Sequence, residues 1–261
     1  MSEDSVLYTR EGSIGIITLN RPECLNAINQ DLLNRLIGHL NSAREDTRVI
    51  TVMLTGAGKS FCAGEDLKET SRGKTLDQWH REIDALQEFQ RVVLKLGKPL
   101  VAAVNGYAVG GGLEFALSCD MRIASRNAKF GFPETSVGLT VTSAGTKLIS
   151  QLVGLGKAKE LIFTGEFVDA PEALRIGLVN RVVPADRLLD ETMALCRTIA
   201  RRSPLSLRLS RIAIDQGLHA SFEQILEIEA SHLLACVASG NQEAFVQQKI
   251  ERIQRGQTDG S

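Results

Sequence analysis

Residues 98–120 constrain the fold most, because they join a buried strand to a helix through a glycine-rich corner. Residues 100–104 are a continuous apolar run, which predicts a strand that is covered on both faces. Residues 105–106 predict a turn, and the glycines at 110–112 open the helix that follows. The first N–H groups of a helix have no acceptor within it, and the helix dipole favours negative charge there. The corner can therefore hold an oxygen atom that becomes an anion.

A second corner of the same kind occurs earlier in the chain. Residues 49–55 are an apolar, β-branched run, and residues 56–64 form a glycine-containing loop after it. If parallel strands place both loops at one end of a sheet, N–H groups near residues 64–65 and 110–111 converge, and two converging donors make an oxyanion hole. The alternative is a pair of tight turns that need glycine for steric reasons. Spacing alone leaves both interpretations open.

Two carboxylates accompany these corners. Glu114 lies just inside the apolar helix, where a structural protein gains little from a glutamate. Glu134 follows Pro133 in an apolar segment. Two carboxyl groups that face one site can divide general-base and general-acid work when their environments separate their pKa values. The alternative for Glu134 is a glutamate that completes the N-terminal cap of a helix.

The rest of the chain predicts an α/β core followed by a helical region. Residues 6–20 predict a hairpin, and residues 177–183 predict a strand. Amphipathic patterns predict helices at 29–44, 75–96, 188–202, 204–216, 221–238 and 241–255. Composition shifts near residue 200, so we expect a core over residues 1–200 and a helical oligomerisation region over residues 201–261. The apolar faces of that region need a partner surface, which a homo-oligomer would supply.

Composition and motifs argue against several other classes of protein. A net charge of −1 argues against nucleic acid as the main partner, although residues 197–211 hold a cluster of arginines. No apolar run reaches the ~20 residues of a membrane helix. The N-terminus resembles no signal peptide and the five cysteines are scattered, so we expect a cytoplasmic protein with reduced thiols.

Three further kinds of site are not expected. A P-loop ending at residues 56–60 would need glycine where Met53 stands. The four histidines lack ligand spacing, so we expect no metal site. Cys62 has no base beside it in the sequence and is expected to be a core residue.

Taken together, these stretches resemble the enoyl-CoA hydratase/isomerase family, also called the crotonase family. The resemblance extends from residue 17 to residue 245 and is most specific in residues 60–68 (SFCAGEDLK), 103–114 (AVNGYAVGGGLE) and 130–134 (FGFPE). It implies an α/β, crotonase-like spiral of ββα turns with a C-terminal helical trimerisation region. It also implies a homotrimer, often stacked into a hexamer.

The resemblance implies roles for individual residues. The backbone N–H groups of Glu65 and Gly111 would hold the thioester oxygen of an acyl-CoA substrate as it gains enolate character. Glu114 would orient and activate water for attack at the β-carbon. Glu134 would supply the proton to the α-carbon.

Binding of coenzyme A is also implied by the resemblance. The residues matched to this role are Ala63, Lys59, Lys68 and, from a neighbouring subunit, Lys249. Coenzyme A is part of the substrate, and we expect no other cofactor and no metal.

The chain departs from the family's hydratases at two places. They commonly carry Pro-Gly-x-Gly-Gly-Thr after the second glutamate, where this chain has Val141, Thr142 and Ala144 in place of the proline and two glycines. Glu65 is acidic rather than small, and its charge could disfavour a simple fatty acyl chain. Both departures leave the acyl group open, but not the acyl-CoA class.

We therefore expect an enoyl-CoA hydratase, a hydro-lyase of the kind that acts in fatty acid metabolism. The alternatives on the same site are enoyl-CoA isomerisation and dehydration of a specialised hydroxyacyl-CoA. An RNA-binding or an inactive member of the family is a more remote alternative.

Overall fold

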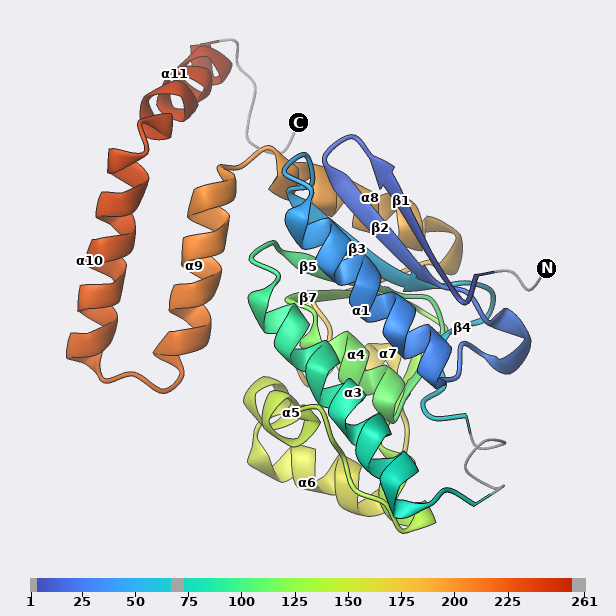
Figure 1. The fold of residues 1–261 in the computed structure, drawn as a ribbon. Coiled ribbons are helices and arrows are strands. Elements are labelled where there is room, and N and C mark those ends of the chain that lie inside the picture. Colours follow the sequence, from blue (N-terminus) through green and yellow to red (C-terminus); the bar gives the residue numbers. More distant parts are fainter. Residues whose placement is uncertain (1–3, 67–72, 255–261) are drawn as a thin grey trace.

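The computed structural model describes residues 4–66 and 73–254 (Figure 1). Its strands are β1 Val6–Glu11, β2 Ile14–Leu19, β3 Thr51–Gly56, β4 Ser60–Cys62, β5 Leu100–Val104, β6 Tyr107–Val109, β7 Met121–Ser125, β8 Lys129–Gly131, β9 Val168–Asp169 and β10 Arg181–Val183. Its α-helices are α1 Gln30–Glu45, α3 Leu76–Lys95, α4 Gly111–Ser118, α5 Gly145–Val153, α6 Leu155–Thr164, α7 Ala170–Arg175, α8 Leu188–Ala200, α9 Pro204–Gly217, α10 Phe222–Ala238 and α11 Asn241–Gln254. Short 3-10 helices are η1 Pro22–Cys24, η2 Pro133–Val137 and η3 Ala185–Arg187.

The described strands form two sheets. The larger has the order β1-β2-β3-β5-β7-β10 and is parallel apart from the β1–β2 hairpin. The smaller has the order β4-β6-β8-β9, in which β4, β6 and β8 run parallel. The consecutive pairs β3–β4, β5–β6 and β7–β8 each give one strand to each sheet. The chain therefore winds as a spiral, which confirms the predicted fold.

The strands of the smaller sheet were not expected from the sequence. β4, β6 and β8 each have three residues, too few for an alternating pattern to emerge. The predicted strand over residues 177–183 is also shorter in the structure, where only Arg181–Val183 pairs with β7. Leu178 and Val179 instead donate their N–H groups to the carbonyl of Ala173 and are buried in the core.

The continuous apolar run of β5 is explained by cover on both faces of the larger sheet. Leu100, Ala102 and Val104 pack into the core that includes residues of α1, α3 and α4. Val101 and Ala103 face the opposite way, into a second core closed by α8. A strand covered on both faces needs no polar alternation.

Local signals account for the helices beside this sheet. The Asn29 side chain accepts the N–H of Leu32 and starts α1, while Thr75 and Gln78 form a reciprocal capping box at the start of α3. Leu32, Leu36 and two other leucines of α1 are fully or almost fully buried. Each buried leucine contributes about 1.5–3 kcal/mol through removal of its surface from water.

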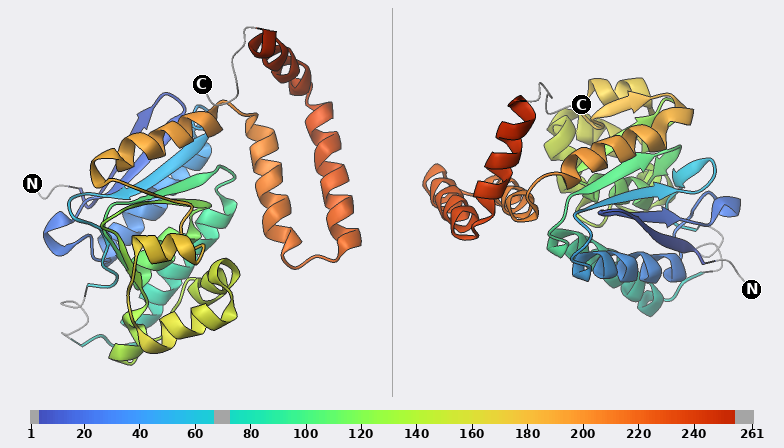
Figure 2. Two further views of the ribbon diagram at one scale, coloured as in Figure 1. Left: turned by 180° about the vertical axis from the view of Figure 1, so that it is seen from behind. Right: turned by 90° about the horizontal axis from the view of Figure 1, so that it is seen from above.

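The last three helices, α9, α10 and α11, stand beside the core and do not wrap it (Figures 1 and 2). Arg211 of α9 reaches the core through an ion pair with Asp120, at 2.7 Å between Nε and Oδ1. Within the described residues, no helix has the length and apolar content that crossing a membrane requires.

Candidate active site

The glycine-rich corner is sterically required by the way α4 meets β4. Gly110 is the N-cap of α4 and has φ 54 and ψ −128, a conformation that L-residues with side chains rarely adopt. A Cβ added to Gly112 would lie 2.1 Å from the carbonyl oxygen of Cys62. The start of α4 therefore touches the backbone of β4, so this corner needs glycine for steric reasons whether or not its N–H groups also bind an oxyanion.

The same contacts bring the two loops together. β4 and β6 are parallel neighbours in the smaller sheet, with Cys62 opposite Ala108, so the segments that follow them leave the same edge. A Cβ added to Gly64 would lie 2.8 Å from the carbonyl oxygen of Val109 and 3.7 Å from Cα of Gly110. Glu65 and Gly111 consequently line one cavity. The loops converge through the short strands β4 and β6 and not directly from the ends of β3 and β5.

Glu114 lines this cavity and is almost completely buried, with 2% exposure. The backbone N–H of Thr142 donates to its Oε1. The Thr142 hydroxyl lies 3.0 Å from Oε2 and 3.2 Å from Oε1. Burial raises the pKa of Glu114, and hydrogen bonds from Thr142 and from the Ser143 side chain act against that rise because they favour the ionised form.

Glu134 enters the cavity from η2, directly after Pro133. Its Oε2 is buried, and no described residue makes a hydrogen bond to it. Burial raises the pKa of Glu134 to about 7, and the negative charge of Glu114 adds to the rise. Glu134 does lie in the first turn of a helix, as the alternative interpretation expected, but the N-cap of η2 is Phe132 and no side-chain cap hydrogen bond is made there among the described residues.

Both carboxyl groups face the Gly110–Gly111 corner. A Cβ on Gly110 would lie 2.9 Å from Oε1 of Glu134, and one on Gly111 would lie 3.9 Å from Oε2 of Glu114. The carboxylate of Glu114 accepts hydrogen bonds from Thr142, whereas Oε2 of Glu134 has no hydrogen-bond partner among the described residues. Such a pair can supply a base and an acid to a single reacting molecule at neutral pH.

The cavity that holds these groups has a volume of about 600 Å³. Most of its wall is apolar and comes from α3, the segment around η2 and the two loops. Its residues are Ile28, Ala63, Gly64, Glu65, Trp79, Glu82, Ile83, Leu86, Val109, Gly110, Gly111, Glu114, Pro133, Glu134, Ser136, Val137, Leu139, Thr140 and Thr142.

An ion cluster that the sequence did not suggest borders the same cavity. Lys74 Nζ lies 2.7 Å from Oε1 of Glu65 and 2.5 Å from Oε2 of Glu82, and 4.7 Å from the ring centre of Trp79. Only 11% of the Lys74 side chain is exposed. The charge of Glu65 is therefore compensated by a lysine, which weakens the expectation that it repels an aliphatic acyl chain.

The remaining residues matched to coenzyme A binding lie at different places. Ala63 lines the cavity, whereas Lys59 is exposed in the turn between β3 and β4. Lys68 lies outside the described residues. Lys249 is on α11 and lines a groove between the C-terminal helices.

Two other expectations concern cysteine and metal chemistry. Burial raises the pKa of the Cys62 thiol to about 12, which makes it a poor nucleophile and fits a core residue. In the part of the chain that the structure describes, no three His, Cys, Asp or Glu side chains are grouped as metal ligands.

Thr142 is the site residue that sequence reasoning missed. Its position was noted as a departure in a stretch near Glu134, with no link to Glu114, which lies 28 residues earlier in the chain. Lys74 and Glu82 were missed as well, because a charged residue at the edge of a predicted amphipathic helix is normally a solvated one.

Known proteins are similar to this chain over almost its whole length. The family model described as enoyl-CoA hydratase/isomerase matches residues 9–254. A short-chain-enoyl-CoA hydratase of Clostridium acetobutylicum is 40% identical over 253 residues, and a crotonyl-CoA hydratase of Syntrophomonas wolfei is 36% identical over 254 residues; each alignment covers 97% of both chains. The crystal structure of an enoyl-CoA hydratase from Bacillus anthracis has a TM-score of 0.90 at 31% identity, covering 98% of this chain and 100% of that one.

Proposed function

The chain belongs to the enoyl-CoA hydratase/isomerase family, and on this premise we propose that it catalyses reversible addition of water to the 2,3 double bond of a 2-enoyl-CoA thioester. The observation that carries the proposal is the pair of buried carboxyl groups, Glu114 and Glu134, at one glycine corner of one cavity. Hydration needs a base for water and an acid for carbon, and this pair can provide both.

The proposed reaction begins at the thioester. Its carbonyl oxygen accepts hydrogen bonds from the backbone N–H groups of Glu65 and Gly111. These donors stabilise the negative charge that develops on that oxygen, and loss of one such donor costs about 10²–10³ in rate. The position of Gly111 at the start of α4 adds the favourable end of the helix dipole.

The two carboxyl groups then divide the proton transfers. Glu114, held by Thr142, removes a proton from water as the water oxygen bonds to the β-carbon. Glu134 donates its proton to the α-carbon, which restores the neutral thioester. Exchange with solvent returns both groups to their starting states, and no electrons are gained or lost. The reaction as proposed therefore requires no metal and no redox cofactor.

Coenzyme A is the carrier part of the substrate in this proposal. Ala63 lies beside Glu65 in the cavity wall. Lys59, Lys68 and Lys249 are proposed to contact its phosphates, with Lys249 supplied by a neighbouring subunit.

Crotonyl-CoA is the first substrate to test, because similar proteins are named for it and for short-chain enoyl-CoA. Loss of the conjugated thioester absorbance is expected for the wild type. For Glu134→Gln we expect a fall in kcat of at least about 10²-fold, the lower range for a general acid, with binding retained. A wild type inactive on 2-enoyl-CoA substrates of several chain lengths would refute hydration. Full activity in the variant would refute the role of Glu134.

The same assay separates hydration from isomerisation. A hydratase converts crotonyl-CoA to a 3-hydroxyacyl-CoA, whereas an isomerase moves the double bond of a 3-enoyl-CoA. Product analysis with both substrates distinguishes these two reactions on the same site. Dehydration of a specialised hydroxyacyl-CoA is the reverse of hydration and would be found by offering hydroxyacyl-CoA substrates.

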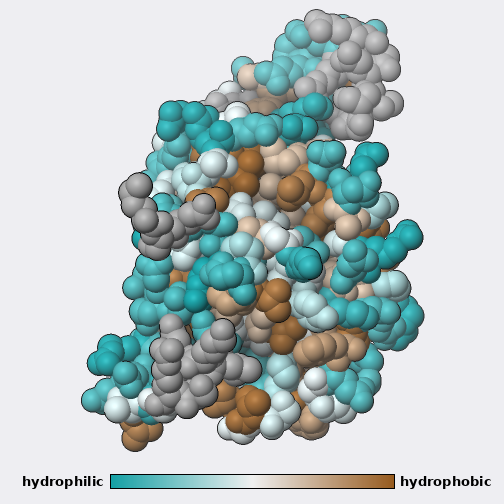
Figure 3. Space-filling view, turned by 90° about the vertical axis from the view of Figure 1, so that its right-hand side faces the viewer, coloured by the Kyte–Doolittle hydropathy of each residue, from teal (hydrophilic) through white to brown (hydrophobic). Residues whose placement is uncertain are grey.

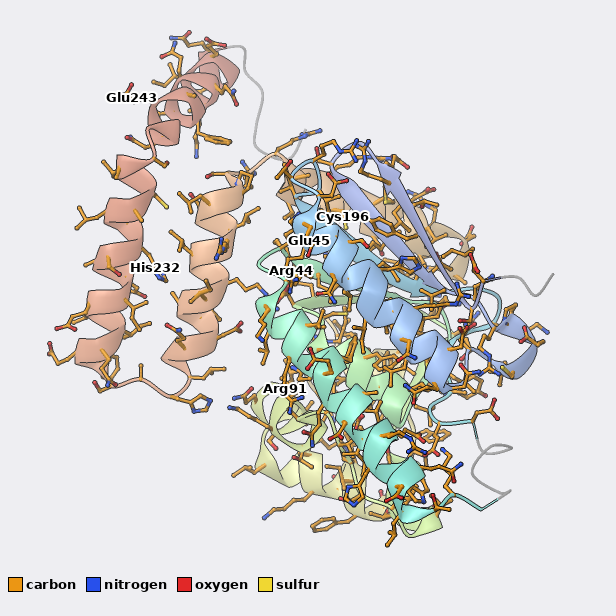
Figure 4. All side chains as sticks on the ribbon, in the orientation of Figure 1. Arg44, Glu45, Arg91, Cys196, His232 and Glu243 are labelled. Carbon is orange, nitrogen blue, oxygen red and sulfur yellow. The ribbon has the colours of Figure 1, made fainter. Side chains whose placement is uncertain are left out.

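We further propose that α9–α11 assemble the chain into a homotrimer or a hexamer. They enclose a mostly apolar groove of about 870 Å³, and on α10 His232 lies on the side that faces α9 (Figure 4). Their exposed apolar side chains include Phe222 at 88% and Leu234 at 68% exposure. On the face seen in Figure 3, by contrast, hydrophobic residues are scattered among hydrophilic ones.

Light scattering on the eluting protein tests this assembly. A mass of three or six times 28.4 kDa is expected, and a mass of 28.4 kDa would refute it. The expected cytoplasmic location stays a prediction.

A further inference from the structure

Thr142 offers Glu114 two hydrogen-bond donors, its backbone N–H and its side-chain hydroxyl. That hydroxyl lies 3.0 Å and 3.2 Å from the two carboxylate oxygens of Glu114, and the backbone N–H of the same residue donates to Oε1. A glycine could supply the backbone donor but not the side-chain donor. The hydroxyl contact therefore depends on the side chain at position 142.

We propose that Thr142 is a positioning residue whose hydroxyl holds Glu114 in its ionised form and in one orientation, ready to accept a proton from water. This inference rests on the proposed hydration reaction. According to this proposal, the hydroxyl helps to make Glu114 the base, while Glu134 remains the acid.

The donor direction follows from chemistry. An ionised carboxylate only accepts hydrogen bonds, so the Thr142 hydroxyl donates to it. Hydrogen bonds to a charged group in a buried site are about twice as strong as neutral ones. Glu114 is 2% exposed, so its carboxylate depends on donors from the protein more than an exposed carboxylate would. Glu134 offers the contrast within the same cavity, since its buried Oε2 lacks a partner among the described residues.

The backbone around Thr142 is arranged independently of its side chain. Ser143 and Ala144 have φ of 45 and 60, in the left-handed region, and the N–H of Gly145 donates to the carbonyl of Thr142 at 2.6 Å. A Cβ on Gly145 would lie 3.2 Å from Cγ of Glu114. This turn packs directly on the glutamate, so exchange of the Thr142 side chain should leave the loop in place.

Other ionisable groups around Glu114 are shared by every variant of residue 142. In the described part of the cavity wall they are Glu134 from η2, Glu65 from the loop after β4 and Glu82 from α3. Lys74 is paired with the last two. A shift in the titration of Glu114 that appears in Thr142→Val but not in Thr142→Ser is thus attributable to the hydroxyl.

The matched substitutions are Thr142→Val, which removes the hydroxyl and keeps the shape, and Thr142→Ser, which keeps the hydroxyl. Thr146→Val serves as the control for a threonine-to-valine change, because Thr146 is exposed on α5 four residues away. The pH profile of kcat/KM with crotonyl-CoA is measured for each.

For Thr142→Val we expect kcat/KM at neutral pH to fall about ten- to a hundredfold, the usual worth of a hydrogen bond to a charged group. The acidic limb of the profile should move to higher pH, because Glu114 loses a donor that favours its ionised form. The fall should lie in kcat more than in KM. In Thr142→Ser and Thr146→Val, the acidic limb of the kcat/KM profile should stay at the same pH as in the wild type.

A second readout needs no turnover. In protein labelled with ¹³C at the glutamate carboxyl carbon, the signal absent from Glu114→Gln reports the titration of Glu114. Its midpoint should rise in Thr142→Val. An unchanged midpoint, or an unshifted acidic limb in Thr142→Val, would overturn the role of Thr142. A wild type that is inactive on 2-enoyl-CoA would instead refute the proposed function, while the carboxyl titration would still decide whether Thr142 sets the ionisation of Glu114.

Discussion

Replacement of Glu134 by glutamine should change how the stability of the protein depends on pH. The carboxyl group has an ordinary pKa of 4.5, and burial raises it to about 7 in the folded protein. Between these pH values the folded state binds more protons than the unfolded state. The free energy of unfolding therefore falls as the pH rises through this interval.

The size of the fall follows from the two pKa values. One pKa unit corresponds to about 1.4 kcal/mol, so the whole interval would be worth at most about 3.4 kcal/mol. Glu134 is only partly buried, and solvent screening reduces the expected effect to about 1–2 kcal/mol. Glutamine does not titrate, so Glu134→Gln lacks this loss of stability between pH 4.5 and about pH 7.

Urea unfolding of both proteins at pH 5 and pH 8, at one protein concentration, measures the effect. Relative to the wild type, the variant should gain about 1–2 kcal/mol between the two pH values. Any cost of the buried amide is the same at both pH values and cancels. Glu166→Gln, an exposed position between α6 and β9, controls for the loss of one negative charge. An equal stability difference at pH 5 and pH 8 would refute the argument that burial disfavours ionised Glu134.

Two further predictions concern the pH dependence of the reaction and the close contact at Gly112. For hydration, kcat/KM should fall above about pH 7 as Glu134 loses its proton, and a profile that stays flat to pH 9 would contradict its role as the acid. Gly112→Ala would place Cβ 2.1 Å from the carbonyl oxygen of Cys62, so we expect a loss of at least about 1–3 kcal/mol of stability, measured by thermal unfolding. Gly156→Ala on α6 meets nothing within 4 Å and should be tolerated; equal melting temperatures for the two variants would contradict the predicted clash.

Much of the fold could be predicted because its signals are local. The hairpin, the buried strands β3 and β5 and the long helices α1 and α3 each carry their own pattern of apolar residues or caps. The strands of the smaller sheet carry no such pattern. They are two or three residues long and are defined by pairing with segments about 20–50 residues away, as Cys62 with Ala108.

The candidate site divides in a similar way. Its glycines, Glu114 and Glu134 could be identified because their residue types are unusual for their places in the sequence. Lys74 and Thr142 could not, because a lysine before a helix or a threonine in a loop has nothing unusual about it. Their significance comes from distances of 2.7 Å to Glu65 and 3.0 Å to Glu114, which arise only when separate turns of the spiral pack together.

The sequence by itself determined which chemical groups this protein has and where a helix begins, since the glycines at 110–112 and the apolar run before them are visible in a short stretch of chain. Only the tertiary structure decided that two glutamates 20 residues apart share a cavity, and that they differ in hydrogen bonding. Burial and donor geometry, which set the pKa of a carboxyl group, depend on every segment that packs against it. The sequence could therefore identify Glu114 and Glu134 as candidates. The environments that make one a base and the other an acid could be found only in the folded structure.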